Sequence, residues 1–171
     1  ENSNESGTVI IPALEGTRPL LVEIQSLVAP TPYVPPHRTS DSIDIKKIQL
    51  LLAVLEKRVH LNMGTCDVYV KVAGGIKIDD PAVDLALCCA MASSFRNQSI
   101  KPQTIIFGEV GLSGEVRSVS QPDIRVREAI RMGFTNIILP AKNLERLEHF
   151  ASNVQIHGVR YLSEALKIAL N

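Results

Sequence analysis

The sequence has no tryptophan and only 4% aromatic residues, so its core contains few large rings. Because 45% of the residues are hydrophobic, Ile, Leu, Val and Ala must supply most of the buried surface. A chain of 171 residues buries roughly 70% of the surface that it exposes when unfolded, which is enough for one sizeable core. These properties are typical of one soluble domain.

Net charge is also absent, because 18 basic residues balance 18 acidic ones. This balance argues against a polybasic coat for nucleic acid but allows a local basic face. The charges are unevenly spread: residues 117–146 contain six Lys or Arg against three acids.

Cysteine is scarce, and the three thiols at Cys66, Cys88 and Cys89 suit no disulfide framework. We therefore expect a reducing compartment, and the scattered histidines predict no metal site. No apolar run reaches the roughly 18–20 residues of a membrane helix, and no signal peptide is present. Because the chain begins with Glu1, we expect a fragment of a longer protein.

The pattern along the chain predicts a polar tail at residues 1–7 and one domain at residues 8–171. Two strands, 8–16 and 17–28, flank a turn at Gly16, and Pro12 favours an edge position for the first strand. A proline-rich segment, 29–42, is expected to be a stiff surface loop or, alternatively, a segment that grips a neighbouring subunit. Apolar residues at helical spacing then predict a helix over 44–61, capped by Ser42 or Asp44.

The remaining pattern alternates between strands and helices. We expect strands at 67–72, 104–107, 136–139 and 154–156. We expect helices beginning at Asp80-Pro81 and covering 122–132, 142–150 and 163–170, of which the first is apolar nearly all round. This order is typical of an α/β (α+β) domain in which helices cover a mixed sheet.

Three blocks of sequence carry a resemblance to one family. They are EGTRPLLVEIQSLV at 15–28, IQLLLAVLEKR at 48–58 continuing into DVYVKVAGGIKIDDPAVDLALCCAMASSFRN at 67–97, and FGEVGLSGEVRSVSQPDIRVREAIRMGF at 107–134 followed by NIILP. In this order they resemble the C-terminal Lon-protease-like domain of the bacterial RadA (Sms) family of DNA-repair ATPases. The likeness covers most of residues 7–171.

The resemblance implies a fold like the Lon proteolytic domain, which is a ribosomal protein S5 domain 2-like fold. It also implies a hexameric ring that binds DNA without sequence preference and acts in recombinational repair and branch migration. The chain has no GxxxxGK[ST] and no CxxC pair, so ATP, Mg²⁺ and Zn²⁺ are expected only in upstream domains. The implied location is the bacterial cytoplasm, or an organellar matrix or stroma in a eukaryote.

The resemblance also identifies where a Lon protease keeps its Ser nucleophile and Lys base, and both are replaced. The nucleophile position in the DGPSAG-like stretch is Ala82, whose methyl group cannot attack a peptide bond. Ungapped matching of the following block places the lysine position at Asp123. We therefore predict that this domain is not an enzyme, although a Ser–Lys pair relocated elsewhere is the alternative. The candidates for such a pair are Ser93, Ser94, Ser113, Ser118 and Ser120 with Lys71, Lys77 and Lys101.

Three acids surround the start of the apolar helix, at Asp79, Asp80 and Asp84. Clustered carboxylates are typical of a hard-cation site, but acids in a first helical turn also stabilise the positive end of the helix. We favour the capping role, and a partner arginine across a subunit boundary is a further alternative for Asp84.

The candidate DNA-binding residues are Arg117, Arg125, Arg127 and Arg131. A guanidinium group engages two phosphate oxygens at once, and exposed helical ion pairs are too weak to occupy these groups. No recognition-helix motif predicts base-specific contact, and no set of stacking aromatics predicts single-strand binding. The rival roles are contacts between subunits and a platform for a RecA-type recombinase.

Overall fold

The first hairpin follows directly from its sequence. Strand β1 (Thr8–Glu15) and strand β2 (Arg18–Pro30) pair antiparallel in register from Thr8 opposite Gln25 to Glu15 opposite Arg18. The two-residue turn between them places Gly16 at φ 66°, a left-handed conformation that glycine adopts without a steric cost. The predicted turn is therefore confirmed.

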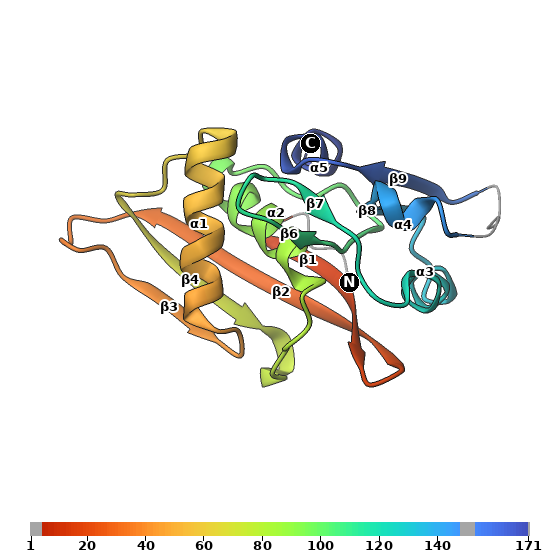
Figure 1. Cartoon of the computed structure of the whole chain (residues 1–171). Coiled ribbons are helices and arrows are strands. Elements are labelled where there is room, and N and C mark those ends of the chain that lie inside the picture. Colours follow the sequence, from red (N-terminus) through yellow and green to blue (C-terminus); the bar gives the residue numbers. More distant parts are fainter. Residues whose placement is uncertain (1–4, 148–152, 171) are drawn as a thin grey trace.

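The hairpin lies inside a seven-stranded sheet in this computed structural model, which describes residues 5–147 and 153–170. The strand order is β3-β4-β2-β1-β5-β8-β9, and in this sheet only β2 runs against the others. Figure 1 shows the sheet crossing the molecule from β3 to β9. The additional strands are β3 (Arg38–Asp41), β4 (Cys66–Val72), β5 (Thr104–Ile106), β8 (Asn136–Pro140) and β9 (Gln155–Val159). The expected α/β class with a mixed sheet is confirmed.

The prediction that Pro12 puts β1 at the edge of the sheet is wrong. Strand β1 lies between β2 and β5, but it pairs with β5 only at Ile10 opposite Ile105. Pro12 falls beyond that pairing, so its missing N–H breaks no ladder on that side. Its carbonyl instead accepts a hydrogen bond from Arg125, at 2.8 Å.

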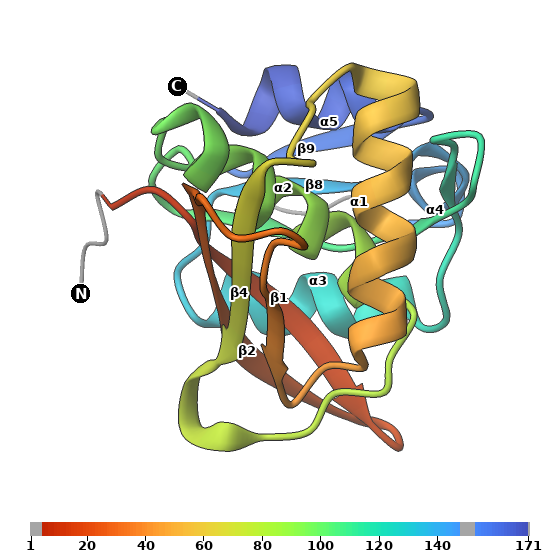
Figure 2. The same ribbon diagram turned by 90° about the vertical axis from the view of Figure 1, so that its left-hand side faces the viewer.

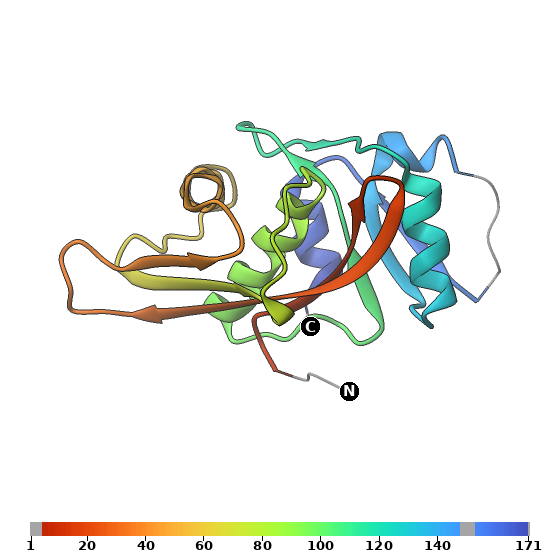
Figure 3. The same ribbon diagram turned by 90° about the horizontal axis from the view of Figure 1, so that it is seen from below.

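The helices lie on the sheet as their apolar stripes require. Helix α1 (Ile45–Val59) is capped by Asp44, whose carboxylate accepts from the Lys46 N–H. Helix α2 (Val83–Arg96) lies against β1 and β2 and also contacts α1, which stands over β3 (Figure 2). Helix α5 (Leu162–Ala169) packs on α2, β8 and β9, and α3 (Pro122–Arg131) packs on β1 and β2 (Figure 3).

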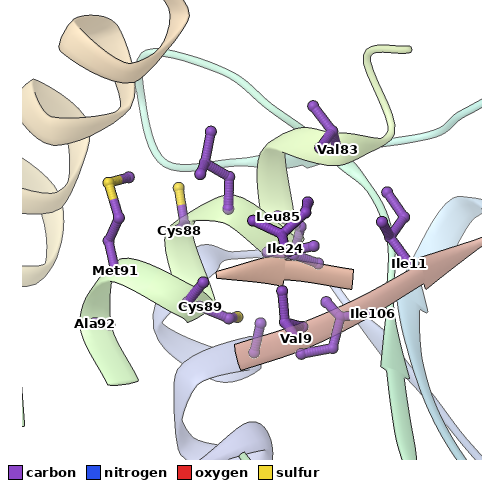
Figure 4. Packing of buried hydrophobic residues seen from close by; sticks show 14 of the residues in the cluster. Val9, Ile11, Ile24, Val83, Leu85, Cys88, Cys89, Met91, Ala92 and Ile106 are labelled. Atoms are coloured by element: carbon purple, nitrogen blue, oxygen red, sulfur yellow. The ribbon is translucent and has the colours of Figure 1, made fainter. Parts of the chain in front are cut away.

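Helix α2 is the centre of the core, as its all-round apolar sequence predicts. Every residue from Val83 to Ser94 is buried. Figure 4 shows Leu85, Cys88 and Cys89 among side chains of β1, β2 and β5. The aliphatic core expected from the shortage of aromatics is therefore present, with Phe107 the one fully buried ring among the described residues.

Some predicted elements are placed differently. The segment predicted as loop contains β3, and residues 107–121 contain an unpredicted hairpin, β6 (Glu109–Val110) with β7 (Val116–Arg117). A short 3₁₀ turn, Ala73–Gly75, follows β4. The helix predicted over 142–150 is only α4 (Ala141–Leu144), and positions 148–150 lie outside the described residues. In the predicted tail, Gly7 is held by Ser93, while residues 1–4 lie outside the described part.

Within the described residues, no helix has the length and apolar character to cross a membrane. Those residues also contain no group of three or more His, Cys, Asp or Glu placed to hold a metal ion.

The buried thiols generate a first prediction. Burial raises the pKa of Cys88, and it raises the pKa of Cys89 to about 12, so both remain protonated near neutral pH. We expect iodoacetamide at pH 8 to leave both unmodified in the folded chain and to label all three cysteines in denaturant. Mass spectrometry of the intact chain measures the difference. Rapid labelling of Cys88 or Cys89 without unfolding would contradict the packing of α2.

Candidate functional site

The loop before α2 is organised around the carboxylate of Asp80, which is 8% exposed. Its Oδ2 accepts from the Leu14 N–H of β1 at 3.0 Å, and its Oδ1 accepts from the Ala82 N–H at 3.1 Å. Asp80 thus satisfies a backbone donor just before α2, but the prediction that it is the N-cap of this helix is wrong, because the N-cap residue is Ala82 and no side chain caps the helix. The helix itself begins two residues later than the Asp80-Pro81 pattern suggests, at Val83.

Arg125 of α3 is the partner of Asp80. Its Nη1 lies 2.8 Å from Asp80 Oδ2 and its Nη2 lies 3.2 Å from Oδ1, so the contact is bidentate. The same guanidinium donates to the carbonyls of Pro12 and Ser120, and it lies 5.8 Å from the centre of the Phe107 ring. Arg125 is 1% exposed. One buried ion pair therefore joins β1, the loop before α2, and α3.

The environment of Asp80 favours its ionised form. Burial raises the pKa of this carboxyl group, but the hydrogen bonds from Arg125, Leu14 and Ala82 and the charge of Arg125 outweigh burial. The pKa of Asp80 therefore lies below its ordinary value. The pair is a charged structural contact at neutral pH.

The ion pair brings positions 82 and 123, where the nucleophile and the lysine are expected, into the same region of the fold. Ala82 follows Asp80 by two residues, and Asp123 precedes Arg125 by two residues. Ala82 is the N-cap residue of α2 and makes no side-chain cap; its methyl group is fully buried, and its carbonyl accepts from the Gly108 N–H at 2.9 Å. A side chain on Gly108 would meet Val116 and Leu85, so glycine permits this close approach. Asp123 lies half-buried in the first turn of α3.

The other acids of this region have separate contacts. Asp84 accepts a hydrogen bond from Lys47 of α1 at 2.7 Å and another from the Val110 N–H. Burial raises the pKa of Asp84 and outweighs the lowering effect of Lys47. Asp79 is exposed. The basic partner of Asp84 is therefore on the same chain, and the described residues hold no metal-binding cluster here.

Two of the serines considered for a relocated protease site, Ser93 and Ser94, bond the backbone instead. Ser93 and Ser94 are buried, and their hydroxyls accept from the N–H groups of Gly7 and Val28. Ser120 does not cap α3 with its side chain, because Gln121 is the N-cap; the Ser120 carbonyl binds Arg125.

The four arginines predicted to contact DNA separate into one buried and three exposed residues. Arg125 as a DNA contact is a wrong prediction, because its guanidinium is inside the protein. It occupies a buried position of α3, one turn before the buried Ala129, and this spacing is the sequence signal that distinguishes it. Arg127 is exposed, and Arg131, one turn further, binds Glu128 through Nε and Nη2 with 69% of its side chain exposed. Arg117 on β7 is 61% exposed and lies 3.5 Å from Glu115.

The buried pair generates a second prediction. Asp80→Asn leaves an uncompensated charge at Arg125, so we expect the free energy of unfolding to fall by about 3–5 kcal/mol. The double variant Asp80→Leu/Arg125→Met fills the same space with apolar side chains and removes both charges. We therefore expect its free energy of unfolding to fall by less than that of Asp80→Asn. Urea denaturation measures both. A single variant as stable as the unchanged chain would contradict a buried, paired Asp80.

The pH dependence separates this charge effect from a packing effect. Because the pKa of Asp80 is lowered in the folded chain, its stabilisation is fully present above the ordinary Asp value of about 3.9. It is lost as the pH falls through the lowered value. The stability difference between the unchanged chain and Asp80→Asn must therefore narrow in acid, whereas a pure packing defect would remain constant.

Comparison with known proteins identifies a protein family for this chain. The family described as the Lon protease (S16) C-terminal proteolytic domain matches residues 46–171. The chain is 44% identical to the DNA repair protein RadA of Halalkalibacterium halodurans and 46% identical to that of Bacillus subtilis, each over 99% of this chain and 37% of the relative. It is 48% identical to the RadA of Synechocystis over 79% of this chain and 27% of the relative.

The chain thus spans little more than a third of the first two relatives. On the matched family and on this identity, the chain belongs to the Lon protease (S16) C-terminal proteolytic domain family and resembles the RadA proteins over most of its length.

Proposed function

We propose that this chain is a non-catalytic domain that binds DNA without sequence preference and joins subunits of a hexameric ring. In this proposal it is part of a RadA-type ATPase that acts in recombinational DNA repair and branch migration in the bacterial cytoplasm. ATP, Mg²⁺ and Zn²⁺ then belong to parts of such a protein that this chain does not cover. The relatives named DNA repair protein RadA support this role.

The absence of catalysis is supported by the side chain at position 82. Ala82 carries a methyl group and is fully buried, so position 82 itself offers no nucleophile. The nearby carboxylate of Asp80 and guanidinium of Arg125 bind each other. In this proposal the region has a structural role, because the Asp80–Arg125 pair connects the loop before α2 with α3.

DNA binding rests chiefly on the guanidinium groups of Arg117, Arg127 and Arg131, which remain at the surface. The donors of Arg131 that face away from Glu128 are still available, since a guanidinium carries five N–H groups and two are used. In a ring, each such group is repeated once per subunit, which strengthens the field acting on a phosphate backbone.

Subunit assembly is supported by the proline-rich segment between β2 and β3. Its two ends are fixed: Thr31 N–H donates to the Thr65 carbonyl, and His37 N–H donates to Asp67. The tip between these anchors exposes Tyr33 by 57% and Val34 by 95%. These two adjacent exposed side chains, on a loop anchored at both ends, are available for a contact with a neighbouring subunit.

A third prediction concerns the DNA contact. We expect the chain to bind duplex DNA of unrelated sequences alike, with an affinity that falls linearly with salt on a double-logarithmic plot. Arg127→Gln and Arg131→Gln should each weaken every duplex similarly and reduce the salt slope by about 1. Fluorescence anisotropy across a salt series measures this, with Lys71→Gln on β4 as the matched loss of charge. A chain that ignores DNA at low salt would contradict the proposal.

A fourth prediction concerns assembly. Val34→Asp places a charge at the exposed tip, so we expect it to shift the chain towards monomer in sedimentation velocity, without lowering the melting temperature. Thr39→Asp on β3 is the control for an added surface charge. Equal sedimentation of the Val34 variant and the unchanged chain would exclude this loop from the subunit contact.

A RecA-type recombinase remains a proposed partner, and a platform that only binds protein would show no DNA affinity.

A further inference from the structure

A hollow of about 570 Å³ lies apart from the buried Asp80–Arg125 pair. Its walls come from three segments that are distant in sequence: β7, the start of α4, and the junction between β9 and α5. Three of the lining residues are cationic, two are acidic and one is aromatic. They are Arg117, Lys142, Arg160, Glu115, Glu145 and Tyr161.

The walls of the hollow are held by backbone hydrogen bonds. The Val116 N–H donates to the Arg160 carbonyl at 2.8 Å, and the Leu162 N–H donates to the Gly114 carbonyl at 2.8 Å. The carboxylate of Glu164 accepts from the N–H groups of Arg160 and Tyr161. Small-molecule sites are usually preformed concave surfaces of roughly 300–1,000 Å³. This hollow has a volume in that range, and hydrogen bonds hold the backbone of its walls.

The charges of the hollow suit a single phosphate group. Arg117 has only a 3.5 Å contact with Glu115, and the described structure gives the side chains of Lys142 and Arg160 no ion pair. Three cations against two carboxylates leave one positive charge in excess. The two carboxylates disfavour a chain of several phosphates, and either can accept a hydrogen bond from an N–H group of a base, such as the N3–H of thymine.

The aromatic side chain supplies the remaining feature of a nucleotide site. Tyr161 is 55% exposed, although its backbone is fixed by Glu164. An exposed ring beside cations offers a surface on which an unpaired base stacks. The sequence alone predicts no single-strand binding. Tyr161 is one aromatic residue without aromatic neighbours in sequence, and Arg160 and Lys142 become its neighbours only in the fold.

We propose that this hollow binds one nucleotide of single-stranded DNA. The phosphate lies between Arg117, Lys142 and Arg160, and the base stacks on Tyr161. The inference rests on the proposed function, because DNA bound by this domain is the source of the strand. It adds a preference for unpaired nucleotides, which the exposed arginines alone do not give.

Two variants test the two halves of the site. Arg160→Gln should lower the affinity for a 20-nucleotide oligo(dT) by about ten-fold and reduce the salt slope by about 1. Tyr161→Leu should lower it by roughly 5- to 100-fold with the salt slope unchanged, and it should leave duplex binding unaltered. Lys71→Gln is the charge control, and thermal melting checks that each variant folds. Because Tyr161 is the N-cap residue of α5, the affinities are compared at a temperature at which each variant is fully folded.

A direct probe uses the unmodified chain with dTMP, inorganic phosphate and thymidine. In two-dimensional NMR, dTMP should shift the amide signals of Ser118, Arg160 and Tyr161 at lower concentration than phosphate, and thymidine should bind weakest. If oligo(dT) binds but Arg160→Gln and Tyr161→Leu bind it like the unchanged chain, the hollow is excluded and the proposed DNA binding survives. If the unchanged chain binds neither single nor double strands, both proposals fail. Equal losses for duplex and oligo(dT) in Tyr161→Leu would overturn the stacking.

Discussion

The bidentate contact between Asp80 and Arg125 is the constraint on which the candidate site depends. It is buried, and it links β1, the loop before α2, and α3 through hydrogen bonds to Pro12, Leu14 and Ala82. A buried ion pair of this kind contributes position more than net stability, because desolvation offsets much of the attraction. The pair fixes the position of α3 relative to the loop before α2.

The chain belongs to a proteolytic-domain family, but the positions expected for the Ser nucleophile and the Lys base carry other residues. In a Ser–Lys enzyme the hydroxyl and the amine must lie within hydrogen-bond reach of each other and of a peptide. Here position 82 carries a buried methyl group, and position 123 carries an acid in the first turn of a helix, where acids are favoured. The same scaffold keeps its interior contacts and exposes Arg117, Arg127 and Arg131.

Much of the fold follows from local pattern. The alternating residues of β2, the cap of α1 and the apolar sequence of α2 each predict their element, because burial repeats at a fixed period. Strand β3 was not predictable in this way. Its sequence, Arg38–Asp41, is polar, and it is a strand only because β4 pairs with it. The short β6–β7 hairpin likewise depends on tertiary pairing, since two-residue strands have no period.

The site was predictable only in part. Sequence matching identifies Ala82 and Asp123, because their neighbours retain a family pattern, but it does not show that Asp80 binds Arg125 across 45 residues. It also groups Arg125 with Arg127, although one faces the core and the other faces solvent. Lys142, Arg160 and Tyr161 are brought to one hollow by the packing of α4 and β9, which no spacing along the chain reveals.

The most direct test of this account is to restore the two protease residues. In the variant Ala82→Ser/Asp123→Lys, intact-mass measurement after treatment with a fluorophosphonate reports whether a reactive hydroxyl exists. The account predicts no covalent adduct, because position 82 is enclosed and the Asp80–Arg125 pair still joins α2 to α3. An adduct mapped to position 82, together with cleavage of an unfolded protein, would contradict it.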